Sequence, residues 1–173
     1  MTSSHKTTVQ RGKGSTYLAL GDLYTFLATG EDTGGAYSIT EVLMQPQSVI
    51  PSHRHDQADE AHYILEGEIE YQLEDQTIIA NSGTFINFPK NQYHGFKNIS
   101  SNPAKILMII TPSGSEQFFS EMGQRILEPM SEEEKRNLLF PPNPADIEKA
   151  IEASVAKLTR EEQKSCNLEL VAK

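Results

Sequence analysis

The chain lacks tryptophan, has a single cysteine and contains no long apolar run. Because Cys166 is the only cysteine among 173 residues, no disulfide can form within the chain, and nothing indicates an oxidising compartment. The longest aliphatic run, Ile106–Ile110, is far too short to cross a bilayer. The first residues, MTSSHKTTVQRGKGSTY, have no apolar core of the kind that secretory signals carry. We therefore expect a cytoplasmic protein with no membrane partner.

Runs of basic residues are also missing. The formal net charge is −9, and no lysine or arginine cluster follows the pattern that binds a phosphate backbone. Nucleic acid is therefore not an expected partner. With 37% hydrophobic and 23% charged residues, the composition is that of an ordinary globular protein. The length suits one domain over residues 1–173, which is long enough to bury a core.

Short strand-like stretches separated by turn residues run from about residue 17 to residue 111. Segments such as GEDTGG, NSG and SSNP provide the turn chemistry between them. Many short strands at near-regular spacing predict a sandwich or a barrel. The predicted strands are Leu23–Ala28, Ala36–Met44, Glu60–Glu66, Ile69–Leu73, Thr77–Ala80, Phe85–Phe88, His94–Asn98 and Lys105–Thr111.

Helical signals follow the strands, over about residues 115–160. Ser131 and Glu134 form a capping box, which predicts a helix over Lys135–Leu139. Asn143 and Pro144 are typical of another helix start. The second helix would pack on the barrel exterior or against a second subunit, because an apolar stripe runs along it at Ile147, Ile151, Val155 and Leu158.

Three of the five histidines fall within ten residues, beside a glutamate. His53 and His55 share one side of an extended chain because side chains alternate with period two. Glu60 and His94 could complete a metal site, since imidazole and carboxylate groups are metal ligands. Periodicity alone does not show that His94 returns to the first cluster, and a lone His-x-His pair is a weak signal.

Two spacings resemble a known family. His53-x-His55-x4-Glu60-x6-Gly67 is similar to the first motif of the cupin superfamily, and Gly83-x5-Pro89-x4-His94-x3-Asn98 is similar to the second. Two glycines of the pattern are replaced, by Gln47 and by Asn91. Asparagine tolerates a positive φ comparatively well. The replacement of glycine by Gln47 affects a turn and does not change the set of metal ligands.

The resemblance implies an all-β fold, a double-stranded β-helix (jelly-roll) barrel with C-terminal helical additions. It also implies that His53, His55, Glu60 and His94 hold one divalent transition metal per chain, which would be Fe, Mn, Ni, Co, Cu or Zn. We expect a homodimer as well, because edge strands in the N-terminal segment need pairing or cover.

A finer resemblance concerns function. The segments LATGEDTGGAYSITEVLM, TPSGSEQFFSEMG and FPPNPADIEKAIEAS look like those of single-domain cupins similar to bacterial quercetin 2,3-dioxygenases. This likeness implies a metal-dependent dioxygenase acting on a flavonol-like or other enolisable aromatic small molecule, with Glu60 as the base. Another metal-cupin enzyme (an isomerase, cyclase or hydrolase) and a binding protein without turnover remain as alternatives.

Strand parity identifies the neighbours of the ligands. Arg54 and Lys97 should point away from the ion, and no arginine is placed to meet an anionic substrate. This pattern argues against sugar-phosphate isomerases and oxalate decarboxylases. The residues expected to line the substrate cavity or to support the ligands are His62, Ile64, Tyr71, Phe96, Asn98 and Met108.

Overall fold

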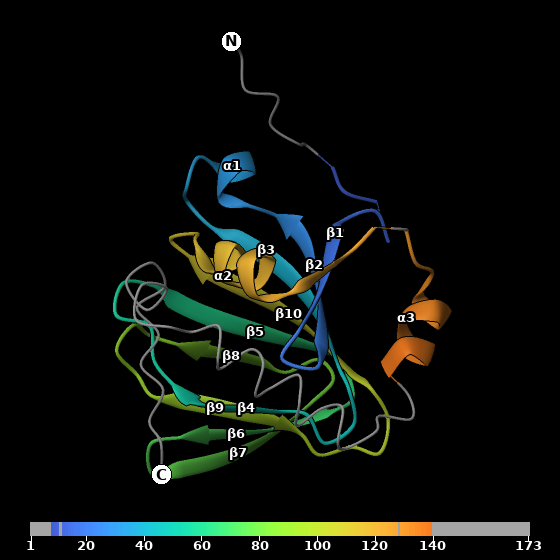
Figure 1. Ribbon diagram of the computed structural model, residues 1–173. Helices are drawn as coiled ribbons and strands as arrows, with labels where there is room; N and C mark the ends of the chain where they lie inside the picture. Colours follow the sequence, from blue (N-terminus) through green and yellow to red (C-terminus); the bar gives the residue numbers. More distant parts are fainter. Residues whose placement is uncertain (1–7, 11, 128, 140–173) are drawn as a thin grey trace.

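A computed structural model describes residues 8–10, 12–127 and 129–139. Two antiparallel sheets face one another and form a double-stranded β-helix barrel, which confirms the predicted fold class (Figure 1). In sheet order, the larger sheet contains β11 (Gln124–Ile126), β1 (Ser15–Ala19), β2 (Asp22–Ala28), β3 (Ser38–Met44), β10 (Ala104–Thr111), β5 (Asp59–Glu66) and β8 (Phe85–Phe88). The smaller sheet contains β4 (Val49–His53), β9 (His94–Asn98), β6 (Glu68–Leu73) and β7 (Gln76–Asn81).

All eight predicted strands are present, with ends that differ by no more than two residues. The sequence reading missed β1, β4 and β11 as separate strands. It also took the segment GEDTGG for a turn, whereas Gly30–Thr33 forms the short helix α1. Thr29 and Asp32 cap this helix reciprocally, and such a local exchange of hydrogen bonds lets a turn-like sequence close one helical turn.

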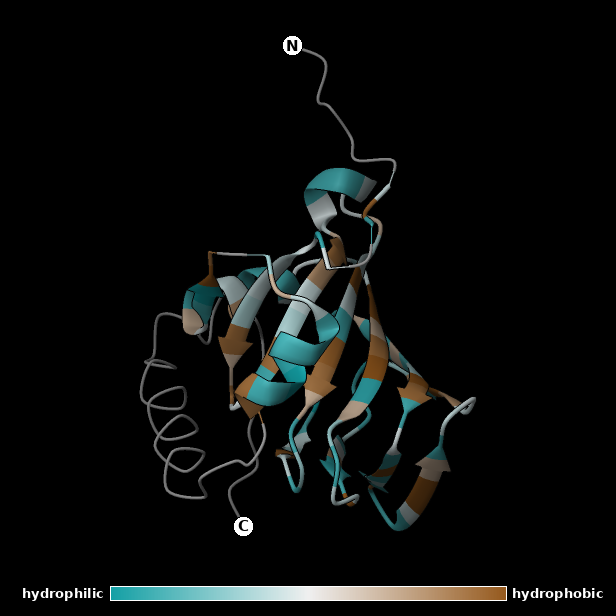
Figure 2. Cartoon of the chain, turned by 90° about the vertical axis from the view of Figure 1, so that its right-hand side faces the viewer, coloured by the Kyte–Doolittle hydropathy of each residue, from teal (hydrophilic) through white to brown (hydrophobic). Residues whose placement is uncertain are grey.

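The barrel core follows from alternation along the strands. On β10, Ile106, Met108 and Ile110 are buried, whereas Leu107 and Ile109 between them are only partly covered. Apolar and polar bands alternate along several strands in the same way (Figure 2). β5 departs from an ordinary core strand because two of its three inward residues, at positions 60, 62 and 64, are ionisable.

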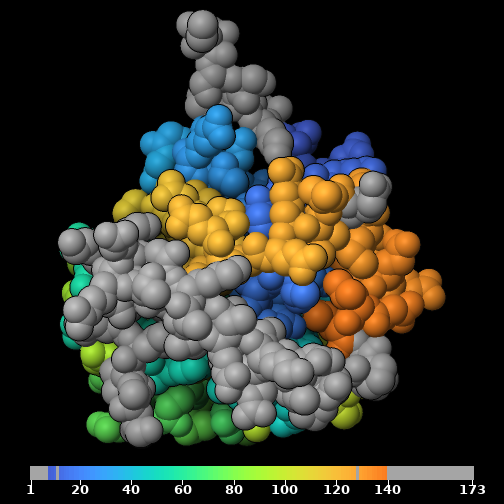
Figure 3. All heavy atoms as spheres, in the orientation of Figure 1, coloured from blue at the N-terminus to red at the C-terminus, as the bar shows by residue number. Residues whose placement is uncertain are grey.

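Two longer helices lie outside the barrel. On α2 (Ser115–Met122), Phe119 stacks on Tyr24 with ring centroids 4.0 Å apart. The predicted capping box begins α3 (Glu132–Leu139): the Ser131 amide donates to Glu134, and the Glu134 amide donates to the Ser131 hydroxyl. Figure 3 shows residues of the 120s and 130s, in orange, against blue N-terminal residues. The helix predicted from Asn143 lies outside the described residues.

None of the helices in the described ranges has the length and apolar character needed to span a bilayer. The edge of β1 is covered within the chain, because β11 pairs with it in antiparallel register. We expected a homodimer because edge strands in the N-terminal segment need pairing or cover, and β11 already pairs with one such edge within the chain. The dimer itself stays a prediction.

The turn between β3 and β4 is held by buried polar side chains. The carboxylate of Asp22, which is wholly buried, accepts hydrogen bonds from the Gln45 amide at 2.9 Å and from the Ser48 hydroxyl at 2.6 Å. The Asn98 amide group donates to the Met44, Gln45 and Asn102 carbonyl oxygens. These bonds fix the direction in which β4 leaves the turn, and β4 ends at a candidate ligand, His53.

Both positions at which a motif glycine is replaced keep a left-handed backbone. Gln47 has φ +63° and Asn91 has φ +67°. Backbone hydrogen bonds support both conformations, from the Gln47 amide to Asn98 and from the Asn91 amide to His55. The turns therefore survive the loss of glycine, although a left-handed non-glycine residue costs roughly 1–2 kcal/mol.

Gly67 and Gly83 offer a matched test of crowding, because each has φ +89°. A Cβ at Gly67 would lie 2.6 Å from the Ala104 Cβ, whereas one at Gly83 would meet nothing within 4 Å. We expect Gly83→Ala to lower the free energy of unfolding by about 1–2 kcal/mol through backbone strain alone. Gly67→Ala should cost about 1–3 kcal/mol more, because the core must also shift. Urea unfolding measures both losses, and equal losses would show that Ala104 gives way freely.

Asp22 predicts an unusual pH dependence. Burial raises its pKa from 3.8 to about 7, although hydrogen bonds from Ser48 and the Gln45 amide work in the opposite direction. Between these two values the folded state holds a proton that the unfolded chain has released. The contribution of Asp22 to stability is therefore complete below about pH 4 and is lost as the pH rises to about 7.

Asp22→Asn should remove this dependence, because an amide does not ionise and still accepts the bond from the Gln45 amide. We expect the free energy of unfolding of the variant, relative to the parent chain, to rise by up to about 4 kcal/mol between pH 4 and pH 7. Taking the difference between the two proteins cancels the titration of the histidines. Urea unfolding across this pH range gives the measurement, and a flat difference would contradict the shifted pKa.

Candidate metal centre

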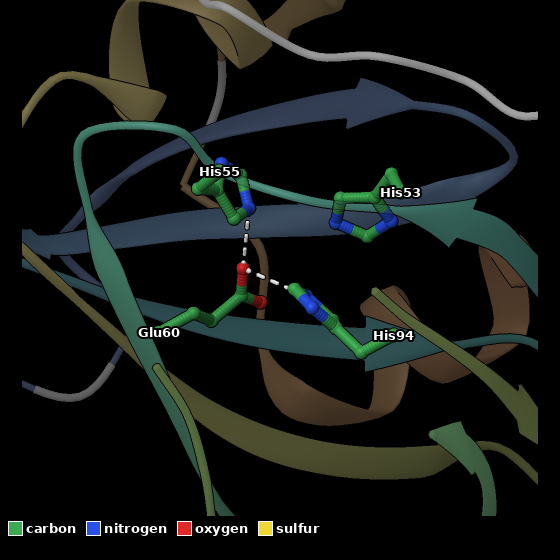
Figure 4. Close-up of side chains that lie close together, drawn as sticks. All are labelled: His53, His55, Glu60 and His94. Atoms are coloured by element: carbon green, nitrogen blue, oxygen red, sulfur yellow. Dashed lines mark ion pairs between the residues drawn. The ribbon is translucent and has the colours of Figure 1, made fainter. Parts of the chain in front are cut away.

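Strand pairing brings two distant histidines together. His53, the last residue of β4, pairs directly with His94, the first residue of β9. His55 follows two residues later, and Glu60 comes from β5 in the facing sheet. Figure 4 shows the four side chains pointing toward one another from these elements. The return of His94 to the first cluster, which periodicity could not show, is thus a result of the β4–β9 pairing.

The potential ligand atoms converge closely. One ligand atom from each of His53, His55, Glu60 and His94 lies within 4.8 Å of the others. The Glu60 Oε2 atom is 2.7 Å from His55 Nε2 and 3.4 Å from His94 Nε2 (Figure 4). All four residues are buried or nearly so, and a small cluster of this kind has the dimensions of a single-ion site.

Main-chain carbonyl groups orient two of the imidazoles. His53 Nδ1 lies 2.9 Å from the Pro51 carbonyl oxygen, and His94 Nδ1 lies 3.1 Å from that of Gln92. A carbonyl oxygen can only accept, so each Nδ1 carries the proton and donates it. In the neutral imidazole, Nε2 then keeps a free lone pair. Metal-binding histidines are commonly fixed in this way.

The arrangement fits a divalent transition metal. The Nε2 atoms of His55 and His94 are buried and have no hydrogen-bond partner, although Glu60 is near, because neither contact has hydrogen-bond geometry. Buried polar atoms without a partner are costly and uncommon in proteins. An ion shared by the cluster would satisfy both atoms. Three imidazoles and one carboxylate suit Zn and other first-row metals and leave positions for further ligands.

The charges of the cluster are arranged for binding a cation. Burial alone would raise the pKa of Glu60, but polar contacts with His55, His62 and His94 hold it well below its usual range. Glu60 is therefore ionised at neutral pH. Burial lowers the pKa of His53 from 6.5 to about 4, and a charge on His94 would act in the same direction, so His53 is neutral. An ionised carboxylate and a neutral imidazole are the forms that bind metals.

His62 and Tyr71 lie on the side of Glu60 that faces away from the potential metal ligands. His62 is completely buried, and its Nε2 lies 2.6 Å from Glu60 Oε1, on the carboxylate oxygen that does not face His55. Its Nδ1 lies 2.9 Å from the hydroxyl of Tyr71, which is also completely buried. Parity had placed both side chains inside the barrel, and the structure joins them to Glu60 in one hydrogen-bonded series.

Aromatic rings surround this series. The Phe96 and Phe88 rings meet His62 edge-on, with centroids 4.8 Å and 5.2 Å away, and Phe88 also stacks on His94 at 4.3 Å. The sequence reading named Phe96 but missed Phe88. The parity of β8 contains the signal: Phe88 pairs with Glu60 across the two strands, and so belongs to the same inward row.

The remaining residues named from the sequence are placed differently. Met108 pairs with His62 on the neighbouring strand, and Ile64 is the next inward residue along β5, so both are close to the series. Asn98 lies at the opposite end of β9 from His94, and its side chain bonds to the carbonyl groups of the β3–β4 turn. The contacts of Asn98 are therefore structural. Arg54 lies over the ring of Tyr93, 5.1 Å from its centroid.

Comparison with known proteins adds sequence support. A model of the cupin domain matches residues 40–110, which include all four potential ligands. The chain is 26% identical over 115 residues to quercetin 2,3-dioxygenase of Bacillus subtilis (strain 168), covering 66% of this chain and 34% of that protein. It is 28% identical over 94 residues to polyketide synthase CurC of Streptomyces cyaneus, covering 53% and 60%. The chain thus spans about one third and three fifths of these relatives.

A solved structure agrees on the fold. KdgF from Halomonas sp. superposes with a TM-score of 0.57 at 15% identity, covering 65% of this chain and 97% of that one. At this identity the likeness concerns the barrel only. The barrel, the matched domain and the two ligand motifs lead to one conclusion: residues 40–110 of the chain form a cupin domain.

Proposed function

We propose that the chain binds one divalent transition metal through His53, His55, Glu60 and His94 and acts as a dioxygenase on a flavonol-like or other enolisable aromatic molecule. The observation that carries the proposal is the convergence of ionised Glu60 and buried imidazole Nε2 atoms that lack a partner. The match to a quercetin 2,3-dioxygenase over 115 residues supports the choice of chemistry.

The donor set does not select one metal. Mixed imidazole and carboxylate ligands suit Fe, Mn, Ni, Co, Cu or Zn, and the general order of affinity does not decide among them. A bound metal would supply Lewis acidity that lowers the pKa of a ligated hydroxyl, together with a site for chemistry with dioxygen. The physiological metal therefore has to come from measurement on the purified protein.

The surroundings favour a flat, weakly polar substrate. Rings of Phe88 and Phe96 lie beside His62 and His94, and such side chains bind aromatic molecules by stacking and by excluding water. Among the described residues, the ion-pair contacts of Glu60 are with His55, His62 and His94, and none of them is with a lysine or an arginine. Recognition of a carboxylate or phosphate substrate would require a cation of this kind.

Glu60 is the proposed base. Its carboxylate is ionised at neutral pH, as a proton acceptor must be, and it belongs to the ligand cluster, so it would be adjacent to a hydroxyl bound by the ion. The low pKa makes it a weak base, which is sufficient for a hydroxyl made acidic by the metal. The deprotonated ring would be nucleophilic at carbon, and its cleavage by a dioxygenase would place both atoms of dioxygen in the products.

A second candidate is a metal-dependent cupin enzyme that rearranges an aromatic polyketide without consuming dioxygen. The match to a protein described as a polyketide synthase, over 60% of its length, favours this candidate. The two functions share the proposed metal, the neighbouring aromatic rings and Glu60. An oxygen electrode separates them, because only the dioxygenase consumes dioxygen when quercetin or a polyketide-like phenol is supplied.

The metal assignment predicts about one ion per chain after supplementation and purification, measured by elemental analysis. His94→Ala should weaken binding by at least about 100-fold, more than the 10- to 100-fold typical for loss of a residue that merely supports a ligand. Lys97→Ala is the matched control, because Lys97 lies on the same strand but is only partly buried. A parent chain that stays metal-free with all common divalent ions would refute the ligand set.

The proposed base predicts the kinetics of Glu60→Gln. An amide can still ligate weakly but cannot take a proton at neutral pH. At confirmed full metal occupancy, kcat should therefore fall by about 100- to 10,000-fold. Glu70→Gln removes a carboxylate from the outward side of β6 and should leave kcat unchanged. Turnover near that of the parent enzyme would move the role of base to His62.

A further inference from the structure

The two oxygens of Glu60 have different partners. Oε2 faces the potential ligands, at 2.7 Å from His55 Nε2 and 3.4 Å from His94 Nε2. Oε1 faces away from them and lies 2.6 Å from His62 Nε2, in good hydrogen-bond geometry. One oxygen of the Glu60 carboxylate thus faces the potential metal ligands, and the other faces a second set of residues, His62 and Tyr71.

The proton positions along this second set follow from the chemistry of each group. A carboxylate oxygen can only accept, so His62 Nε2 carries a proton and donates it to Glu60 Oε1. In a neutral imidazole the opposite nitrogen, Nδ1, is then an acceptor, and the Tyr71 hydroxyl donates to it across 2.9 Å. Burial and the charge of Glu60 raise the pKa of Tyr71, so its hydroxyl keeps the proton that it donates.

The imidazole of His62 has little freedom to turn. Its side chain is wholly buried, and the rings of Phe88, Phe96 and Tyr71 lie at 5.2, 4.8 and 5.7 Å between centroids. Rotation would break both hydrogen bonds and would leave Glu60 Oε1 buried without a partner, at a cost of about 1–3 kcal/mol or more for a charged group. The hydrogen bond to Oε1 is therefore preorganised.

We propose that His62 and Tyr71 are positioning residues that reserve Glu60 Oε1, so that Glu60 gives a metal ion one oxygen instead of two. This inference rests on the metal binding proposed above. Carboxylates bind metals through one oxygen or through both, and the second mode takes up an additional coordination position. Holding Oε1 aside keeps that position for a substrate atom, as a catalytic site requires.

The test uses the full-length protein loaded with Co2+, whose visible d–d absorption becomes weaker as the coordination number rises. His62→Phe keeps a buried ring but removes both hydrogen bonds. Tyr71→Phe removes only the hydroxyl that orients His62. His62→Gln is the rescue variant, because its amide can donate to Glu60 and accept from Tyr71. Ile69→Val is the matched control, since it alters a buried inward residue of β6, two positions from Tyr71, without a polar change.

We expect His62→Phe to lower the intensity of the Co2+ absorption and to raise the Co2+ dissociation constant about 10- to 100-fold. Tyr71→Phe should change both in the same direction and to a smaller extent. His62→Gln and Ile69→Val should resemble the parent protein. The absorption reports on the ion directly, so a purely structural role for His62 would not change it.

Three outcomes are decisive. If the parent chain does not bind Co2+, the proposed function fails, and the present inference fails with it. If the parent binds but His62→Phe and Tyr71→Phe keep its spectrum and affinity, the metal site stands and the positioning role is wrong. If His62→Phe does not fold, Tyr71→Phe compared with Ile69→Val decides, because loss of one hydroxyl leaves the buried ring in place.

Discussion

One buried negative charge organises the interior of this protein. Glu60 is 2% exposed inside a barrel whose other inward residues are mostly apolar. Burying an unpaired carboxylate costs several kcal/mol, so the charge persists only because polar atoms from two strands and one loop surround it. His62 lies on β5, the strand of Glu60. His94 lies on β9 in the facing sheet, and His55 lies in the connection from β4 to β5. Two of these histidines, His55 and His94, also belong to the candidate metal site.

The position of this cluster depends on a turn that lies away from it. Between β3 and β4 the chain reverses through Gln47 in a left-handed conformation, with Asp22 and Asn98 bonded to the surrounding main chain. These two side chains come from β2 and β9, so the turn is tied to both sheets. Since β4 carries His53 opposite His94, errors in this turn would move one ligand relative to the other. The buried polar groups of the turn thus serve the geometry of the site.

Local patterns were sufficient to predict much of this arrangement. Period-two alternation correctly placed His62 with Glu60, and the glycine positions of the two motifs correctly located turns, even where Gln47 and Asn91 replace glycine. What failed depends on long-range pairing. Phe88 was missed because its contact with His94 follows from which strands are neighbours. Parity gave the face on which Asn98 lies but not its hydrogen bonds to the β3–β4 turn, and its role toward a substrate stays a prediction.

The charge of Glu60 also links stability with chemistry. In the metal-free chain its ionised form is held by the histidines, which lower its pKa, whereas Asp22 in the same barrel has a raised pKa and contacts only neutral donors. The two carboxylates are both completely or almost completely buried. Their opposite shifts therefore come from their partners and not from their depth. Glu60 lies beside imidazoles, stays ionised and can therefore bind a cation. Asp22 lies beside a main-chain amide and a hydroxyl, and it is a neutral structural group in mild acid.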